Sequence, residues 1–286
     1  MRASGAISSG LAGTVLLSAV AAGAVERFTG DAYNVGSNAL LYHETQYLHA
    51  SGGADRVVLY RCPDGRAFAR KRVHESGDVQ APDFDLIDAR LGYREGVREN
   101  GAQRQVYVQR RSNLPEQAGP LSVPADGVID TGFEAFAQRH WDALVQGETL
   151  RFPYLVPSRR TFYQFKVNRT DAAAASGRTM TIRLAAGNWL SFLLPHIDVV
   201  YDLASHHVVH YEGLSNIRGD DGKNYQVRSE FPIIAAGREV PQAEVDAALS
   251  APLVSSCTAT DSTVSGGGQS TVPEVTTSAQ ARNPNP

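Results

Sequence analysis

Residues 56–73 read RVVLYRCPDGRAFARKRV, and this stretch predicts the basic unit of the fold. Two apolar segments flank Pro63-Asp64-Gly65. Proline fixes one φ angle of a tight turn, and glycine accepts the positive φ that follows it. We therefore expect Val57–Arg61 and Ala67–Val73 to pair as an antiparallel β-hairpin.

Similar short apolar segments, separated by turn residues, occur on both sides of this hairpin. Ala39–Ala50 precedes it, a strand around Gln105–Arg110 follows it, and a second set extends from Arg159 to Phe231. Strands that recur about every 8–12 residues with turns between them are typical of antiparallel sheet. The expected strands of the second set are Arg159–Val167 (with Thr161, Tyr163, Phe165 and Val167 on one face), Thr179–Ala185, Trp189–Leu194, Val199–Leu203, His206–Tyr211 and Tyr225–Phe231.

One amphipathic helix interrupts the strands. Asp130 and Thr131 can cap it, apolar side chains recur at three- and four-residue spacing, and Gly147 can end it. Pro241–Leu249 predicts a second, short helix. The fold class we expect is mainly β (α+β), a curved antiparallel sheet or half-barrel covered by helix 130–146. The side chains expected to line an apolar groove beneath that helix are Phe133, Phe136, Trp141 and Leu144.

The two ends of the chain differ from its middle. Arg2 followed by the uncharged run Leu11–Ala24, ending in Ala22-Gly23-Ala24, has the pattern of a signal peptide over residues 1–24. Residues 255–286 are rich in Ser, Thr, Gly and Pro, and we expect them to be disordered because they have little apolar surface to bury. Residues 25–254 then form a single β-rich domain. The pattern predicts a secreted, periplasmic protein without a transmembrane segment after signal cleavage.

Composition and motifs exclude several function classes. With 27 basic and 30 acidic residues the formal charge is −3, which argues against nucleic-acid binding. His206, His207 and His210 cannot share a metal on a strand, since His207 points away from the other two. The chain contains no G-x-S-x-G, H-E-x-x-H, C-x-x-C or S-x-x-K motif. We therefore expect no metal and no cofactor, and we favour a non-catalytic protein over an enzyme.

Three aspartates and two cysteines need a separate interpretation. Asp83, Asp85 and Asp88 alternate with apolar residues and predict a strand with a polar face, not a calcium loop. Cys62 and Cys257 are candidates for a disulfide, which an oxidising compartment would favour. The position of Cys257 in the segment that we expect to be disordered argues against this disulfide.

The chain resembles uncharacterised envelope proteins of Gram-negative bacteria and, more distantly, the periplasmic lipoprotein-carrier half-barrels of the LolA type. The resemblance lies in the signal peptide, in the strands from Arg159 to Phe231, and in Tyr201-Asp202 and Tyr211-Glu212-Gly213. It implies a curved sheet that wraps helices and leaves an apolar groove for acyl chains. It transfers no functional residue.

Three functions are consistent with these patterns. The first is a non-catalytic envelope protein that binds a lipid or another apolar ligand between the sheet and helix 130–146. The second is a structural or protein-interaction module of the cell envelope. The third is a periplasmic hydrolase that uses Glu44, Glu95 or the His206–His210 group, which would require two of these side chains to converge.

Overall fold

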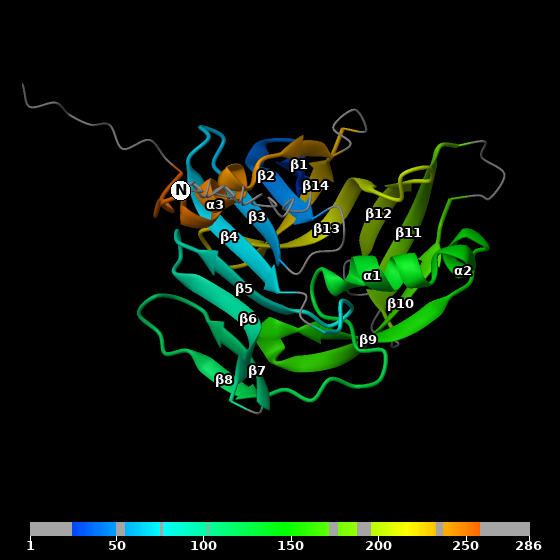
Figure 1. Cartoon of the computed structure of the whole chain (residues 1–286), viewed down its shortest axis with the longest axis horizontal. Helices are drawn as coiled ribbons and strands as arrows, with labels where there is room; N and C mark the ends of the chain where they lie inside the picture. The colour runs from blue at the N-terminus through cyan, green and yellow to red at the C-terminus, as the bar shows by residue number, and fades with distance from the viewer. Residues whose placement is uncertain are drawn as a thin grey trace, which may run out of the picture.

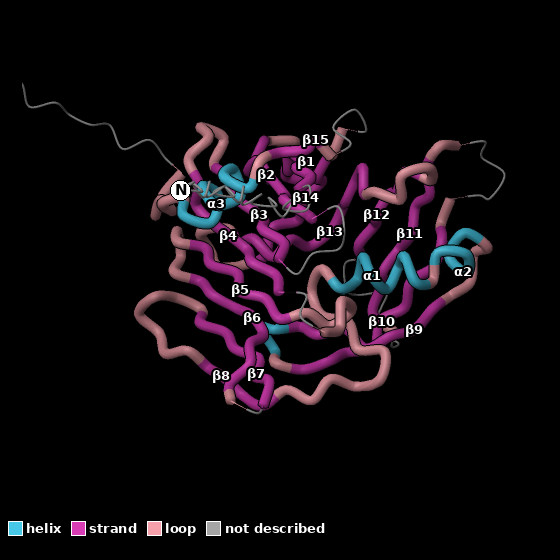
Figure 2. The backbone as a smooth tube through the Cα atoms, viewed as in Figure 1, coloured by secondary structure: helices cyan, strands magenta, loops and turns pink. Residues whose placement is uncertain are grey.

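The computed structural model describes residues 25–49, 55–74, 77–101, 103–171, 177–187, 196–232 and 237–257. Among these residues the strands form one curved, 15-stranded antiparallel sheet, and helices cover only short stretches of the chain (Figure 2). A mainly β fold with a curved antiparallel sheet was predicted from the sequence and is confirmed. The predicted signal peptide, residues 1–24, and most of the predicted tail lie outside the described residues.

The elements follow one another along the chain as two series of strands with a helical segment between them. The first series comprises β1 (Val25–Asn34), β2 (Leu40–His49), β3 (Asp55–Arg61), β4 (Ala67–His74), β5 (Asp83–Asp88), β6 (Tyr93–Asn100), β7 (Gln103–Gln109) and β8 (Gln117–Pro120). The helical segment holds α1 (Gly132–Arg139) and α2 (Trp141–Val145). The second series comprises β9 (Leu150–Val156), the 3-10 helix η1 (Pro157–Arg159), β10 (Thr161–Arg169), β11 (Thr179–Ala186), β12 (Ile197–Asp202), β13 (Val208–Arg218), β14 (Asn224–Glu230) and β15 (Arg238–Val240), followed by α3 (Gln242–Ser250).

The β3–β4 hairpin forms as its turn residues predict. Arg61 pairs with Ala67, and the amide of Gly65 donates to the carbonyl of Cys62 at 2.8 Å. Gly65 has a φ of +88°, a value that residues with a side chain rarely adopt. Asp83–Asp88 is a strand, as its alternation predicts, and Asp83, Asp85 and Asp88 pair with the guanidinium groups of neighbouring arginines.

Strand β1 joins the two series into one sheet. It pairs with β2 on one side and β14 on the other, and β15 pairs with its first residues. The order is β8-β7-β6-β5-β4-β3-β2-β1-β14-β13-β12-β11-β10-β9, so β8 and β9 are the two edges. Residues 121–131, called the crossing segment below, leave β8 and lead to α1, and Figure 1 shows α1 lying in front of β10–β12.

Backbone contacts with two different parts of the chain hold the crossing segment in place before α1 begins. Val128 forms a parallel bridge with Tyr154 of β9, and the amide of Ile129 donates to the carbonyl of Gln80 at 3.1 Å. Gly132 lies so close to Gln80 that a Cβ atom would stand 2.0 Å from its carbonyl oxygen. Only glycine therefore permits this approach, which fixes the start of α1 over the sheet.

Both faces of β3 are buried, because different elements cover them. Val58 and Tyr60 belong to the core that also contains Phe68 and Phe84. Val57 and Leu59 pack instead with α3, through Val245. Because alternate residues of a strand point to opposite faces, α3 covers the face of the sheet opposite to Tyr60. A third core packs α1 and α2 against β9–β12.

The helix predicted over residues 130–146 is shorter and is interrupted. It starts at Gly132, and His140, with φ −108° and ψ 23°, separates α1 from α2. After this break Trp141 packs on the ring of His206 at 3.9 Å and edge-on to Tyr201. Asp130 was expected to help cap the helix, but its carboxylate pairs with Lys71 instead. The predicted strand Trp189–Leu194 lies outside the described residues.

Candidate functional site

A cavity of about 320 Å³ lies between the sheet and the start of α1. A volume of this size is at the lower end of the range for small-molecule sites, which is about 300–1,000 Å³. Its walls come from strands of both series and from α1. The apolar part of its lining includes Phe28, Leu48, Phe133, Val156, Phe165, Leu184, Ile197, Val199, Val208, Leu214, Val227 and Phe231.

Strand β2 contributes both polar and apolar side chains to the lining of this cavity. Its residues Tyr42, Glu44, Gln46 and Leu48 all line the cavity, because they are spaced by two along the strand and share one face. Three of the four are polar, although this face is turned towards the interior. A strand that places polar side chains inwards is a sign of a site, because buried polar groups are costly unless they find partners.

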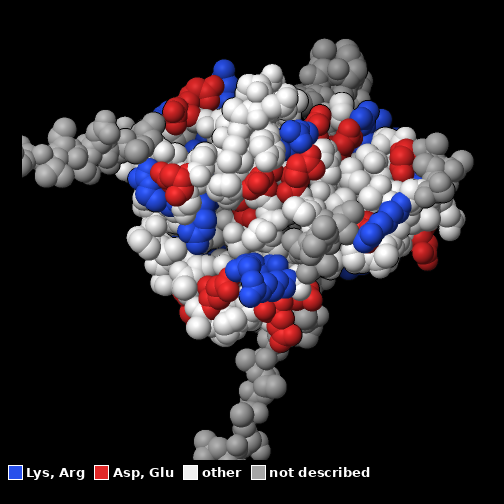
Figure 3. Space-filling view, turned by 90° about the horizontal axis from the view of Figure 1, so that it is seen from above, with Lys and Arg blue, Asp and Glu red and all other residues white. Residues whose placement is uncertain are grey.

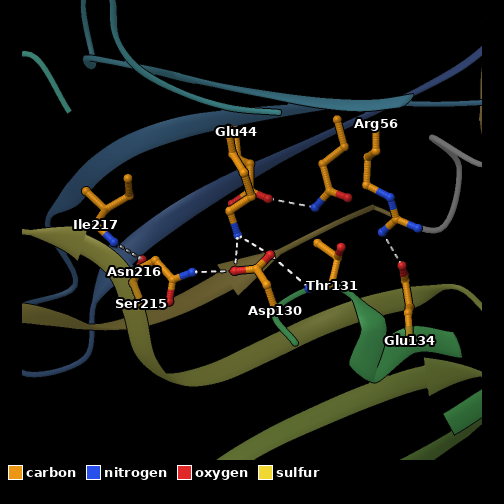
Figure 4. A network of polar contacts seen from close by, with 10 residues as sticks. Glu44, Arg56, Asp130, Thr131, Glu134, Ser215, Asn216 and Ile217 are labelled. Carbon is orange, nitrogen blue, oxygen red and sulfur yellow. Dashed lines mark hydrogen bonds and ion pairs between the residues drawn. The ribbon is translucent and has the colours of Figure 1, made fainter. Parts of the chain in front are cut away.

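A buried ion pair anchors the polar end of the cavity. Lys71 Nζ of β4 donates to both carboxylate oxygens of Asp130, at 2.7 and 2.9 Å, and the two side chains are only 8% and 5% exposed. Asn216 Nδ2 donates to the same carboxylate at 2.9 Å, as does the amide of Thr131 at 2.8 Å (Figure 4). Asp130 has a φ of +48°, a left-handed conformation that aspartate tolerates better than most residues.

A second ion pair lies beside the first. Arg56 Nη1 of β3 donates to Glu134 Oε2 of α1, so this pair connects the sheet to the first turn of the helix (Figure 4). The helix N-terminus is also electrostatically favourable for the Glu134 carboxylate. Together the two pairs hold the crossing segment on the sheet at the rim of the cavity.

Glu44 is the carboxylate of the cavity that has no cationic partner among the described residues. Its Oε1 atom accepts one hydrogen bond, from Gln46 Nε2 at 2.6 Å. The side chain reaches the cavity but is surrounded by protein, and this burial raises the pKa of the Glu44 carboxyl above its ordinary value. Lys71 opposes the shift from a distance, and Asp130 adds to it.

Several tyrosine side chains lie near the carboxyl groups of Glu44 and Asp130. The hydroxyl of Tyr42 shares a hydrogen bond with Ser215 Oγ at 2.8 Å, and Tyr211 donates to the carbonyl of Leu214 at 2.5 Å. Tyr60 and Tyr154 also line the cavity, and their hydroxyls have no hydrogen-bond partner within the described part of the chain. Burial raises the pKa of both phenols well above the ordinary value, so both are protonated at neutral pH.

The structure separates the four side chains that the sequence assigns to an apolar groove. Phe133 lines the cavity. Phe136 and Leu144 lie in the core between the helices and β9–β12, where they are 3% and 0% exposed. Trp141 stacks on His206 at the far end of the helical segment. The residues that sequence reasoning missed are Lys71, Asp130 and Asn216, which come from distant parts of the chain.

Two of the residues considered for hydrolysis, Glu44 and His207, line the same cavity, and the others lie elsewhere. Glu44 lies in the cavity, whereas Glu95 is buried beside Tyr93, whose hydroxyl donates to Glu95 Oε2 at 2.5 Å. His207 lines the cavity, His206 contacts Gln138, and His210 pairs with Glu230 at 3.0 Å. Among the described residues no group of three or more His, Cys, Asp or Glu side chains is arranged to hold a metal ion.

Cys62 and Cys257 form a disulfide across a sequence separation of 195 residues. Cys62 is fully buried, and the bridge attaches residues 251–257 to the core of the first series. The amide of Val254 donates to the carbonyl of Ala67 at 2.8 Å, which holds the same segment against β4. The ordered chain thus extends a few residues into the segment that was expected to be a tail.

Comparisons with known proteins leave the family of the chain open. No family model matches the sequence, and no curated protein matches it. A crystal structure of a β-barrel-like protein of the domain of unknown function DUF1849 from Brucella abortus is similar in structure. The TM-score is 0.44 at 10% sequence identity, and the similarity covers 73% of this chain and 96% of that one. A likeness at this level assigns no function to the chain.

Surface properties add two observations. Figure 3 shows acidic and basic side chains of both signs distributed across the face that it presents. Within the described ranges, no helix has the length and apolar character needed to cross a membrane.

We predict that the folded protein becomes less stable as the pH rises above the ordinary range of glutamate. Burial raises the folded-state pKa of both Glu44 and Glu95. Their contribution to stability is therefore fully present below the unfolded-state pKa of about 4.3 and is lost as the pH rises through the folded-state values. Urea unfolding of the wild type at several pH values between about 4.3 and neutral measures this loss.

Matched variants separate this effect from other titrations. Glu44→Gln and Glu95→Gln should each flatten the dependence of the unfolding free energy on pH. Glu212→Gln changes an exposed carboxyl on β13 and should leave the dependence unchanged. The explanation is wrong if the first two variants follow the wild-type profile.

Proposed function

We propose that this protein binds an amphipathic ligand, with the apolar part of the ligand in the cavity between the sheet and α1. The observation that carries the proposal is the cavity itself, which has a wall of aromatic and aliphatic side chains and a polar group of residues at one end. Ligand sites are mostly apolar with a few polar groups that fix orientation. The hydrophobic effect would supply most of the affinity, in proportion to the apolar area removed from water.

The sequence-based interpretation supports the same proposal and gives it a location. Residues 1–24 predict export, and the resemblance to LolA-type carriers implies an apolar groove for acyl chains. We propose that the protein acts in the periplasm and that its ligand is a lipid or a lipid-like amphiphile. Recovery of a chain that starts at Val25 in the osmotic-shock fraction of host cells tests the location. Recovery of the uncleaved chain in the cytosol contradicts it.

A substitution that fills the cavity should weaken binding without unfolding the protein. Val208 is half-buried at the start of β13 and lines the cavity, so Val208→Trp places an indole in the ligand volume. We expect it to weaken binding of the neutral apolar probe N-phenylnaphthylamine by about tenfold or more, since a lost contact area worth about 1.4 kcal/mol has this effect. The enhancement of probe fluorescence on titration measures the affinity.

The matched control is Val35→Trp, which adds the same side chain at an exposed position that does not line the cavity. It should bind the probe as the wild type does. Circular dichroism establishes that both variants fold. Equal binding by Val208→Trp and the wild type, or an equal loss in the two variants, would place the bound probe outside this cavity.

A further inference from the structure

We propose that the polar end of the cavity binds the primary ammonium group of a single-chain amphiphile, with the Glu44 carboxylate as its counter-ion. The inference rests on the proposed function, because the chain of the amphiphile would lie along the apolar wall. The inference goes beyond that function because it specifies the charge and the hydrogen-bonding capacity of the ligand headgroup, which the apolar wall does not determine.

The first argument is the charge balance of the cavity. Lys71 and Asp130 neutralise each other, and so do Arg56 and Glu134. Glu44 receives only the hydrogen bond from the neutral amide of Gln46. The ring of His207 also lines the cavity and packs against Phe28 at 4.8 Å. Glu44 is therefore the one carboxyl group of this part of the cavity without a cationic partner among the described residues, which favours a cationic ligand group.

The second argument is the set of hydrogen-bonding groups that face the cavity around Glu44. Tyr60 is only 5% exposed, and its hydroxyl has no partner among the described residues, like that of Tyr154. The buried polar atom of the cavity lining that lacks a partner among the described residues is Thr131 Oγ1. Buried polar groups almost always have partners, so this atom indicates a polar ligand. A primary ammonium has three N–H donors, and Glu44 and the hydroxyl of Tyr60, which interacts electrostatically with Glu44, offer acceptors for them.

The same arrangement disfavours other headgroups. A carboxylate or phosphate would face Glu44 as a like charge. Lys71 could not attract it freely, because both of its short contacts go to Asp130. A quaternary ammonium carries the favourable charge but has no N–H to donate, so it would leave the oxygens of Glu44 and the hydroxyls unpaired. A neutral alcohol would gain the apolar contacts without the charge-assisted hydrogen bond.

Calorimetric titration with four dodecyl compounds tests the inference, each used below its micelle concentration and at neutral pH. We expect dodecylamine to bind the wild type most tightly, followed by dodecyltrimethylammonium and dodecanol, with dodecanoate weakest. Glu44→Gln keeps the acceptor for Gln46 but removes the charge. It should weaken dodecylamine by about tenfold to a hundredfold, the range for hydrogen bonds to charged groups, and leave dodecanol unchanged.

Two controls accompany the titrations. Glu212→Gln removes an exposed carboxylate on β13 and should bind all four compounds as the wild type does. Butylamine, which has the ammonium but only a short chain, should bind far more weakly than dodecylamine. The ranking of the four compounds on the wild type needs no variant, so it tests the inference even if Glu44→Gln does not fold.

Several results would overturn the inference. These are equal affinity of the wild type for dodecylamine and dodecanol, tightest binding of dodecanoate, an unchanged affinity of Glu44→Gln for dodecylamine, or equally tight binding of butylamine. If dodecanol still binds in the first three cases, only the headgroup assignment fails. If none of the dodecyl compounds binds the wild type, the proposed function fails as well.

Discussion

Replacing Cys62 and Cys257 with serine should lower the free energy of unfolding by as much as about 5 kcal/mol. The disulfide closes a loop across 195 residues, and in the chain-entropy model a cross-link stabilises the fold more as the loop that it closes grows longer. It also holds Val254 and Cys257 against the core of the first series. Without the bridge, we expect residues 251–257 to detach from β4 before the rest of the sheet unfolds.

Urea unfolding of the double serine variant and of the wild type, each with and without a reducing agent, measures this effect. Reduction should destabilise the wild type about as much as the double substitution does, and it should leave the double variant unchanged. A wild type whose unfolding midpoint is the same under oxidising and reducing conditions would contradict the structural role of the bridge.

Lys71→Met should destabilise the protein by about 3–5 kcal/mol, the cost of leaving one member of a buried ion pair without its partner. Asp130 would keep its charge at 5% exposure, with hydrogen bonds only from Asn216 and the amide of Thr131. Because Asp130 lies two residues before the start of α1, we expect the loss to loosen the crossing segment over the sheet. The unfolding free energy from urea titration gives the size of the effect.

The double variant Lys71→Met/Asp130→Asn distinguishes an ion pair from a general packing effect. It removes both charges, so it should be more stable than Lys71→Met alone. Arg98 and Glu116 form an exposed ion pair, and Arg98→Met serves as the control, with an expected cost below about 1 kcal/mol. A Lys71→Met variant as stable as this control would show that the buried pair does not hold the crossing segment.

Local patterns were sufficient to predict the hairpin β3–β4 and α3, because turn residues and periodicity act within a few residues. They failed for β1, whose sequence VERFTGDAYN contains glycine and several polar residues. Pairing with β2 and β14 on both sides makes it a strand, and partners that distant leave no local signal. Strand β9 was missed because it contains Pro153, which an edge strand accommodates.

The site was less predictable than the fold for the same reason. Its apolar side could be anticipated, since Phe133 belongs to the amphipathic pattern of the helix. Its polar end combines Glu44, Lys71 and Asp130, and only the pairing of β2, β3 and β4 and the crossing segment bring them together. The polar residues of β2 that share a face with Leu48 were the available signal, because a two-residue alternation places them on the interior side.

The break at His140 shows how tertiary packing changes a well-formed pattern. Residues 133–144 have the spacing of one continuous helix, yet α1 ends at Arg139 and α2 starts at Trp141. Trp141 stacks on His206, which is in a left-handed conformation with a φ of +59°. This contact requires the chain at Trp141 to leave the direction of α1. Neither contact could be read from the helix sequence.

Mass spectrometry of the protein purified without detergent from its own host tests the central claim most directly. We expect native spectra of the wild type to contain a complex of one chain with one amphiphile, and solvent extraction to release a compound with a long apolar chain. Val208→Trp, purified in the same way, should carry much less of it. A wild type without bound amphiphile that also fails to take one up from host lipid extract, or equal loading of the two proteins, would contradict the claim.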